Sequence, residues 1–293
     1  MNQQFAVVLT ASALVLAPVA TRAQANPSLV WDSVGRILKT PAVETGGYHR
    51  YNLPRRDIAL KVGDVAVAPA LALGAWAGFS GEPTDATMMG DLVLTAAELG
   101  PVLAELANQR VDVTAVHNHL AGGEPQVTYV HFHAQGSATD LGARLEHALA
   151  LTATPRPVAA ASPQPLAIDT AAVFGTLGLS GRAQGNVAQV STILVLGSVT
   201  MHGRALTPAL AYGSPINIQM AGPNRAVATG DLAVLGPRVD PVLDAFATHH
   251  ITATAVHSHL IGESPTIYYI HFWADGTLAE VLRGLRAGLD AGR

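Results

Sequence analysis

Histidines are concentrated in two short windows that lie 140 residues apart and hold seven of the 12 histidines in the chain. Each window contains a His-x-His pair, then a glutamate, then a further histidine. The residues are His117, His119, Glu124, His131 and His133 in the first window, and His257, His259, Glu263 and His271 in the second. Imidazole and carboxylate groups are ligands of first-row transition metals. The pattern predicts a site for a divalent transition metal, with zinc as the favoured ion.

The elements that carry these residues predict how they converge. Residues 111–119 and 251–259 are rich in β-branched side chains and read as strands, in which alternate residues such as His117 and His119 share a face. Residues 127–133 and 267–273 read as second strands, each joined to the first by a turn with Gly and Pro. Antiparallel pairing would set the histidines side by side, with the glutamate at the hairpin end.

The two windows are not identical. The second window has Trp273 where the first has His133, and Glu263 comes one residue earlier than the position aligned with Glu124. His133 is therefore the least defined ligand. Because each copy carries three histidines and a glutamate of its own, we expect two independent sites, with one site shared between the copies as the alternative.

Three functions fit this constellation. The first is a binding protein for a metal ion, or for a small molecule held through the metal. The second is a metal-dependent hydrolase with a metal-bound water, in which Glu124 or Glu263 is a ligand or the general base. The third is a structural envelope protein whose histidines only stabilise hairpins, without metal. The sequence does not decide whether the protein is an enzyme. It has no nucleotide-binding or serine hydrolase motif, and the absence of Cys excludes a thiol nucleophile.

The surrounding pattern predicts an α+β fold with two homologous domains in tandem. Each copy reads as a short helix followed by a β-α-β-β-α core, with helices packed on a mostly antiparallel sheet. Asp240 and Pro241 are expected to begin a helix, and Thr277 and Glu280 to form a capping box. Asp91 and Asp231, which recur before strands, are interpreted as turn or cap carboxylates, with a role as ligand or base as the alternative. Residues 55–57 are interpreted as a solvated turn.

The domain boundaries follow from the repeat and from proline. Segments 140 positions apart match closely, for example Gly90-Asp91-Leu92 with Gly230-Asp231-Leu232. Residues 151–166 hold four prolines among small residues, which is typical of a linker. We therefore predict a first repeat over residues 26–150 and a second over residues 167–293. A repeat of this length is a duplicated domain.

The N-terminus and the composition indicate an exported protein. Residues 5–20 are almost wholly apolar, and Ala23-Gln24-Ala25 gives a small-x-small cleavage pattern, so residues 1–25 are predicted to be a signal peptide. No later segment is apolar and long enough to span a membrane. The expected location is secreted or periplasmic. Charged residues make up only 13% of the chain and the net charge is −4, which argues against a nucleic-acid partner.

Several of these segments also resemble a known family, the LppY/LpqO group of secreted bacterial proteins. The resemblance covers nearly the whole mature chain and rests on Pro69–Gly74, Met89–Leu94, Val116–Leu120, Pro125 and His131-Phe132. It implies export and a duplicated domain of unknown function, and it implies no activity. The named members are lipoproteins, from which this chain departs because it has no Cys.

Overall fold

The computed structural model describes Met1, residues 27–157 and residues 168–293. The predicted signal peptide and residues 158–166 of the predicted linker lie outside the described residues. The two repeats each form an antiparallel sheet with helices packed on it, so the predicted α+β class with two tandem domains is confirmed.

The first repeat is built on a six-stranded sheet. Its strands pair in the order β1-β2-β5-β6-β9-β7, all antiparallel. Their bounds are β1 Ala42–Thr45, β2 Tyr48–Asn52, β5 Trp76–Glu82, β6 Asp85–Thr95, β9 Val127–Gly136 and β7 Asp112–His117. A small three-stranded sheet beside it contains β4 Val65–Ala66, β3 Lys61–Val62 and β8 Gly123–Glu124. The helices are α1 Pro27–Leu38, α2 Pro69–Ala72, α3 Ala96–Asn108 and α4 Ala138–Leu149.

The second repeat has the same topology. Its large sheet has the order β10-β11-β14-β15-β18-β16. The bounds are β10 Gly181–Gln184, β11 Val187–Thr192, β14 Ser214–Gly222, β15 Arg225–Leu235, β18 Ile267–Gly276 and β16 Thr252–His257. The small sheet contains β13 Arg204–Ala205, β12 Thr200–Met201 and β17 Glu263–Ser264. The helices are α5 Thr170–Leu177, α6 Pro208–Ala211, the 3₁₀ helix η1 Gly236–Arg238, α7 Val239–Thr248 and α8 Leu278–Ala291.

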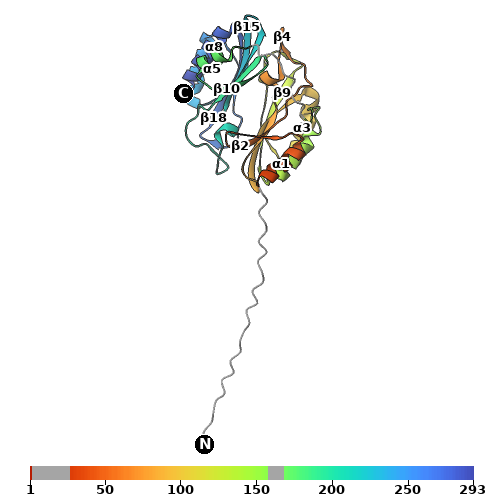
Figure 1. Cartoon of the computed structure of the whole chain (residues 1–293). Coiled ribbons are helices and arrows are strands. Elements are labelled where there is room, and N and C mark those ends of the chain that lie inside the picture. Colours follow the sequence, from red (N-terminus) through yellow and green to blue (C-terminus); the bar gives the residue numbers. More distant parts are fainter. Residues whose placement is uncertain (2–26, 158–167) are drawn as a thin grey trace.

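The long helices lie on the outside of the molecule and the two large sheets lie between them. Figure 1 shows α1 and α3 on one flank and α5 and α8 on the opposite flank. Each repeat has its own apolar core between its helices and its sheet, and a third cluster of buried residues, which includes Tyr48 and Met89 as well as Leu210 and Tyr269, joins the two repeats. The central strand β6 is buried along most of its length because both faces of its sheet are covered.

The two repeats also exchange short elements. Helix α2 of the first repeat contacts β11, β14 and β15 of the second, and α6 of the second repeat contacts β5 of the first. Ion pairs join Asp64 to Arg225 and Asp85 to Arg204 across the interface, each at 2.7 Å. The duplication therefore forms one interlocked unit rather than two separate domains.

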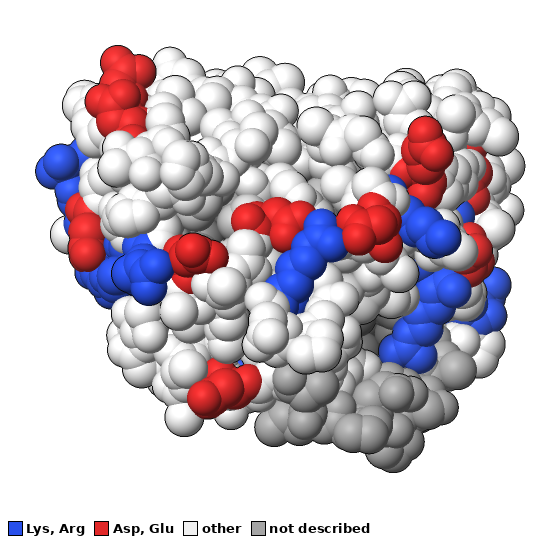
Figure 2. Space-filling view, turned by 90° about the horizontal axis from the view of Figure 1, so that it is seen from above, with Lys and Arg blue, Asp and Glu red and all other residues white. Residues whose placement is uncertain are grey.

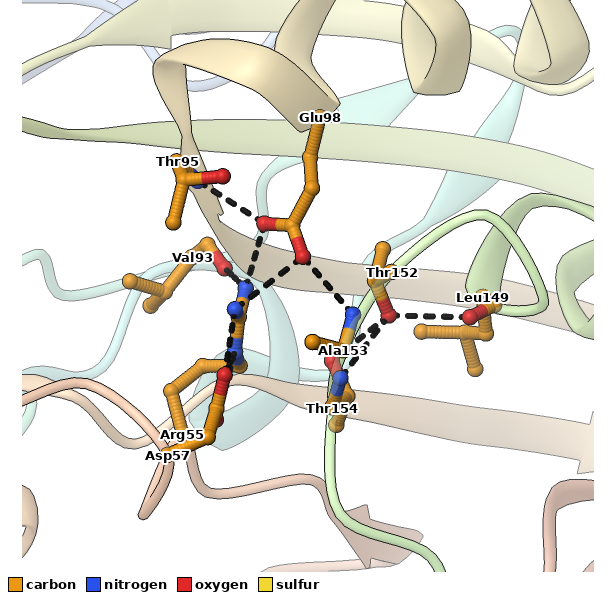
Figure 3. A network of polar contacts seen from close by, with 9 residues as sticks. All are labelled: Arg55, Asp57, Val93, Thr95, Glu98, Leu149, Thr152, Ala153 and Thr154. Carbon is orange, nitrogen blue, oxygen red and sulfur yellow. Dashed lines mark hydrogen bonds and ion pairs between the residues drawn. The ribbon is translucent and has the colours of Figure 1, made fainter.

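Two local expectations are wrong. Arg55 does not lie in a solvated turn, because its guanidinium is fully buried and pairs with Glu98 at 2.8 Å and Asp57 at 2.7 Å. Glu98 also accepts hydrogen bonds from the backbone of Thr95 and Ala153, so this network ties the start of α3 to the segment after α4 (Figure 3). The helix expected to begin at Asp240 begins at Val239, after η1. By contrast, the capping box predicted at the start of α8 is confirmed.

The surface fits the low content of charged residues. Figure 2 shows acidic and basic side chains interspersed on the face viewed, with broad uncharged areas between them. Among the described residues, no helix has the length and apolar character needed to cross a membrane.

Candidate metal centre

Six histidines, three from each repeat, meet where the two large sheets face each other. They are His117, His119, His131, His257, His259 and His271. Among the described residues, three overlapping groups of side chains have ligand atoms within 4.8 Å of one another. These groups are His117, His257, His259 and His271; His117, His119 and His131; and His119, Asp231 and His271. Two of the three groups combine residues of both repeats.

The rings are arranged in stacks that cross the interface. The ring centroid of Tyr129 lies 3.5 Å from that of His119, and the ring of His119 lies 4.0 Å from that of His271. The first two rings come from the first repeat and the third comes from the second repeat. Between the stacks, the rings of His117 and His257 lie 3.9 Å apart, so the first histidine of each His-x-His pair faces its counterpart.

The second stack repeats the first with the roles of the repeats exchanged. The ring of Tyr269 lies 3.7 Å from His259, whose ring lies 3.7 Å from that of His131. Both tyrosines are fixed by their hydroxyl groups, which donate to the carbonyl oxygens of Ala72 and Ala211 at the ends of α2 and α6. The centre therefore has approximate two-fold symmetry, as expected when two copies of one domain face each other.

The strand pairing explains these positions. The edge strands β7 and β16, which end at His117 and His257, pair antiparallel with β9 and β18, which carry His131 and His271. In these ladders His117 is opposite Tyr129, and His257 is opposite Tyr269. The second histidine of each pair follows the end of its strand. Thr254 donates a hydrogen bond to the carbonyl oxygen of His119 at 2.7 Å, which joins the two edge regions directly.

Two aspartates lie beside these histidines, and the sequence interpretation had favoured a structural role for both. Asp91 lies opposite His131 in the ladder and its carboxylate is 3.9 Å from the imidazole. Asp231 lies opposite His271, and its carboxylate contacts Nδ1 of that imidazole. The interpretation of both as turn or cap carboxylates is therefore wrong, because they lie within strands of the sheet. Their repetition 140 positions apart, in step with the histidines, was the signal that could have identified them.

Burial keeps five imidazoles of the centre neutral near pH 7. Loss of hydration, followed by the charge of neighbouring histidines, lowers the pKa of His117, His119 and His259 well below the usual range. The pKa of His131 is lowered to about 3 and that of His257 to about 4, again mainly through burial. A neutral imidazole has a free lone pair on one nitrogen, which is the form that binds metals.

Hydrogen bonding leaves many of these nitrogens available as ligands. Nδ1 of His257 lies 3.1 Å from the carbonyl oxygen of Ser258, which can only accept, so Nδ1 carries the proton and Nε2 has the lone pair. Within the described part of the chain, several buried atoms of the centre make no hydrogen bond, including both ring nitrogens of His117, Nε2 of His119 and Nε2 of His131. Buried polar atoms are normally paired, so this donor set fits a bound cation.

Three of the predicted ligands lie elsewhere. Glu124 is exposed and its strand β8 pairs with β3, while Glu263 accepts hydrogen bonds from Ser258 and from the backbone of Ile267. His133 is buried next to His202, with ring centroids 5.6 Å apart. None of the three belongs to a group of side chains that could hold a metal. Each glutamate lies in a short strand of a small sheet, β8 for Glu124 and β17 for Glu263.

The geometry bears on the expectation of two independent sites. Ligand atoms from both repeats are mixed within two of the three groups, and the rings of His117 and His257 are in contact. The separate hairpins therefore supply one continuous cluster. This arrangement favours the alternative of a site shared between the copies.

A large cavity leads to this centre. It has a volume of about 1450 Å³ and lies between the repeats. His119, His131, His259, Asp91 and Asp231 line it on the side of the centre, while Arg50 and Arg182 line it farther out. A small molecule can therefore approach the histidine cluster from within the interface.

Comparison with known proteins places the duplicated domain in a family. A family model described as "Domain of Unknown Function (DUF1259)" matches residues 32–151 and again residues 171–291. No curated protein sequence matches the chain. Among solved structures, the crystal structure of EtuB from Clostridium kluyveri matches with 15% identity, covers 87% of this chain and 90% of that chain, and has a TM-score of 0.22. A likeness of that size carries no argument about function. The two family matches together span most of the sequence, and the chain therefore belongs to the DUF1259 family, with two copies of its domain.

Proposed function

We propose that this protein binds a divalent transition metal, with zinc favoured, in a single centre shared by its two repeats. The observation that carries the proposal is the convergence of six imidazoles at the interface, with ligand atoms of both repeats inside groups that span no more than 4.8 Å. Ligating nitrogens lie about 2.0–2.1 Å from zinc, so the ligand atoms of these groups must move closer together to coordinate one ion.

The donor chemistry favours a borderline metal over a hard cation. The centre offers imidazole nitrogens and, in Asp231, one carboxylate among its three candidate groups. Calcium and magnesium prefer oxygen ligands, whereas imidazole suits zinc, copper and nickel. The groups overlap at His117, His119 and His271, so the cluster has room for one ion or for two close together.

A metal-dependent hydrolase is a second candidate, and the cavity is the observation that favours it. A site used only for structure is usually closed, whereas a catalytic site keeps a position open to solvent or substrate. Here a cavity of about 1450 Å³ reaches His119, His131 and His259. The glutamates suggested as a general base lie outside the centre, which leaves Asp91 and Asp231 as the carboxylates closest to it.

We further propose that the protein acts outside the cytoplasm, after removal of residues 1–25. The apolar N-terminal segment and its Ala-Gln-Ala pattern support this. The resemblance to the secreted LppY/LpqO group supports the same location. N-terminal sequencing of the exported protein is expected to give a start near Asn26, and an intact Met1 would contradict it.

Metal analysis of protein purified without a histidine tag tests the proposal. The wild-type chain is expected to retain a transition metal after dialysis. One double variant, His117→Ala with His119→Ala, and its counterpart, His257→Ala with His259→Ala, are each expected to lose all of it, because both repeats supply the same centre. Loss of half the metal from each variant would indicate independent sites. A wild-type protein that binds no metal would leave the structural role as the better account.

A further inference from the structure

The two repeats build the cavity walls differently. On β11 and β14 of the second repeat, three amide side chains bind the backbone around α2 of the first. Gln219 accepts from Ala68 N at 2.8 Å and donates to Ala66 O, Gln189 donates to Ala70 O at 2.8 Å, and Asn217 donates to Leu71 O at 2.8 Å. The amide side chains of this wall are therefore already hydrogen-bonded within the protein.

The matching wall of the first repeat lacks these amide hydrogen bonds. Arg50 occupies the position that corresponds to Gln189, and its ladder partner Gly78 corresponds to Asn217. Leu210 of α6 packs directly on Gly78, where a Cβ atom would lie only 2.5 Å from its Cδ1. Apolar packing replaces the amide hydrogen bonds, so Arg50 is left facing the cavity.

Arg50 is held in place but forms no ion pair with a described carboxylate, and Asp91 acts on it only through its charge. Its guanidinium lies 4.3 Å from the centre of the Trp76 ring, its Nε donates to Asn52 at 2.9 Å, and its Nη1 donates to Tyr48 at 3.2 Å. No hydrogen bond within the described chain uses its Nη2. These contacts fix the plane of the guanidinium and leave one edge towards the cavity.

Arg50 is one of the guanidinium groups that line the cavity. Burial lowers the pKa of Arg50 and so does the charge of Arg182, while Tyr48 and the Asp91 carboxylate raise it. Arg182 also lines the cavity and donates to Gln189 at 3.0 Å. The positive charges of Arg50 and Arg182 repel each other. A bound oxyanion would offset this repulsion and accept hydrogen bonds from the guanidinium of Arg50.

We infer that the cavity is a binding site for a small molecule with an oxyanion group, either carboxylate or phosphate, which Arg50 binds while the rest of the molecule extends towards the histidine centre. The anion site at Arg50 does not depend on the proposed function, whereas the placement of the rest of the ligand towards the histidine centre rests on it. It names the class of ligand that a metal at the centre would act on or hold.

Calorimetric titration of metal-free protein with inorganic phosphate, and separately with acetate, tests the anion site independently of the metal. We expect Arg50→Gln to weaken binding of the better probe at least tenfold and Arg50→Lys, which keeps the charge but loses the planar fork, to weaken it less. Arg144→Gln, on the exposed side of α4, is the matched control and is expected to bind as the wild type does. The better probe identifies which oxyanion the site prefers.

The outcomes separate this inference from the proposed function. If the wild-type protein binds neither probe, or if Arg50→Gln binds both as tightly as the wild type, the inference is overturned. Metal content is measured on the same variants, and Arg50→Gln is expected to keep its metal. If the wild-type protein as purified, before any chelator is added, holds no metal, anion binding that depends on Arg50 would support the anion site and contradict the metal centre.

Discussion

Acid should destabilise the metal-free protein through its buried histidines, and His131 gives the clearest case. The pKa of His131 is about 3 in the folded protein against an ordinary value of 6.5, mainly because the ring is buried. Between pH 6.5 and pH 3 the unfolded chain binds a proton at this residue and the folded chain does not. The free energy of unfolding therefore falls as the pH is lowered through this window.

The size of the effect follows from the two pKa values. Between pH 7 and pH 5, His131 alone is expected to remove about 2 kcal/mol from the free energy of unfolding. The pKa of His257 is lowered to about 4, but its ring is only partly buried, so its contribution is smaller. The free energy of unfolding of a domain is typically about 5–15 kcal/mol. The buried histidines together therefore make a large share of this free energy depend on pH.

Urea unfolding at pH 7 and pH 5, with a chelator present, measures this dependence. Replacing His131 with Gln should reduce the difference between the two pH values by about 2 kcal/mol. His147→Gln, which changes an exposed histidine on α4, is the control and should keep the wild-type difference. An unchanged difference in His131→Gln would refute the claim that this imidazole stays neutral in the folded protein.

Three further predictions follow from the contacts described. Arg55→Met should lower the free energy of unfolding in urea by about 3 kcal/mol, because it leaves the Glu98 carboxylate without its buried partner, whereas Arg36→Met on the exposed side of α1 should change it little. Gly90→Ala should cost about 1–3 kcal/mol in the same assay, since a Cβ atom would lie 2.3 Å from the Trp76 oxygen, while Gly100→Ala, with open space around it in α3, should be neutral or stabilising. Glu124→Gln and His133→Gln should each keep the full metal content of the wild type. Loss of metal from either variant would show that the replaced residue is a ligand.

The sequence was sufficient for features that depend on local pattern. The apolar face of α1, the capping box at the start of α8 and the antiparallel pairing of the strands with the histidines all follow from spacing along the chain. The repeat made the duplication evident. These features share one property, which is that a few neighbouring residues determine each of them.

What the sequence did not reveal depends on how the repeats dock. No local pattern shows that the ring of His117 meets that of His257, because this contact is made by two surfaces that lie far apart in the chain. The two glutamates lie in the short strands β8 and β17 of the small sheets, whose pairing with β3 and β12 no local pattern shows. Asp91 and Asp231 were assigned a turn or cap role because a carboxylate before a strand is usually a turn residue, and only strand pairing shows each one next to a histidine.

The position of the bound ion tests the central claim most directly. Crystals of the tag-free protein grown with zinc can be measured at the zinc absorption edge, where anomalous scattering locates the metal without reference to the protein. We expect density between the repeats, within about 2.1 Å of imidazole nitrogens from both His-x-His pairs. Separate peaks that each contact histidines of one repeat only, or no peak in this cluster, would contradict a shared centre.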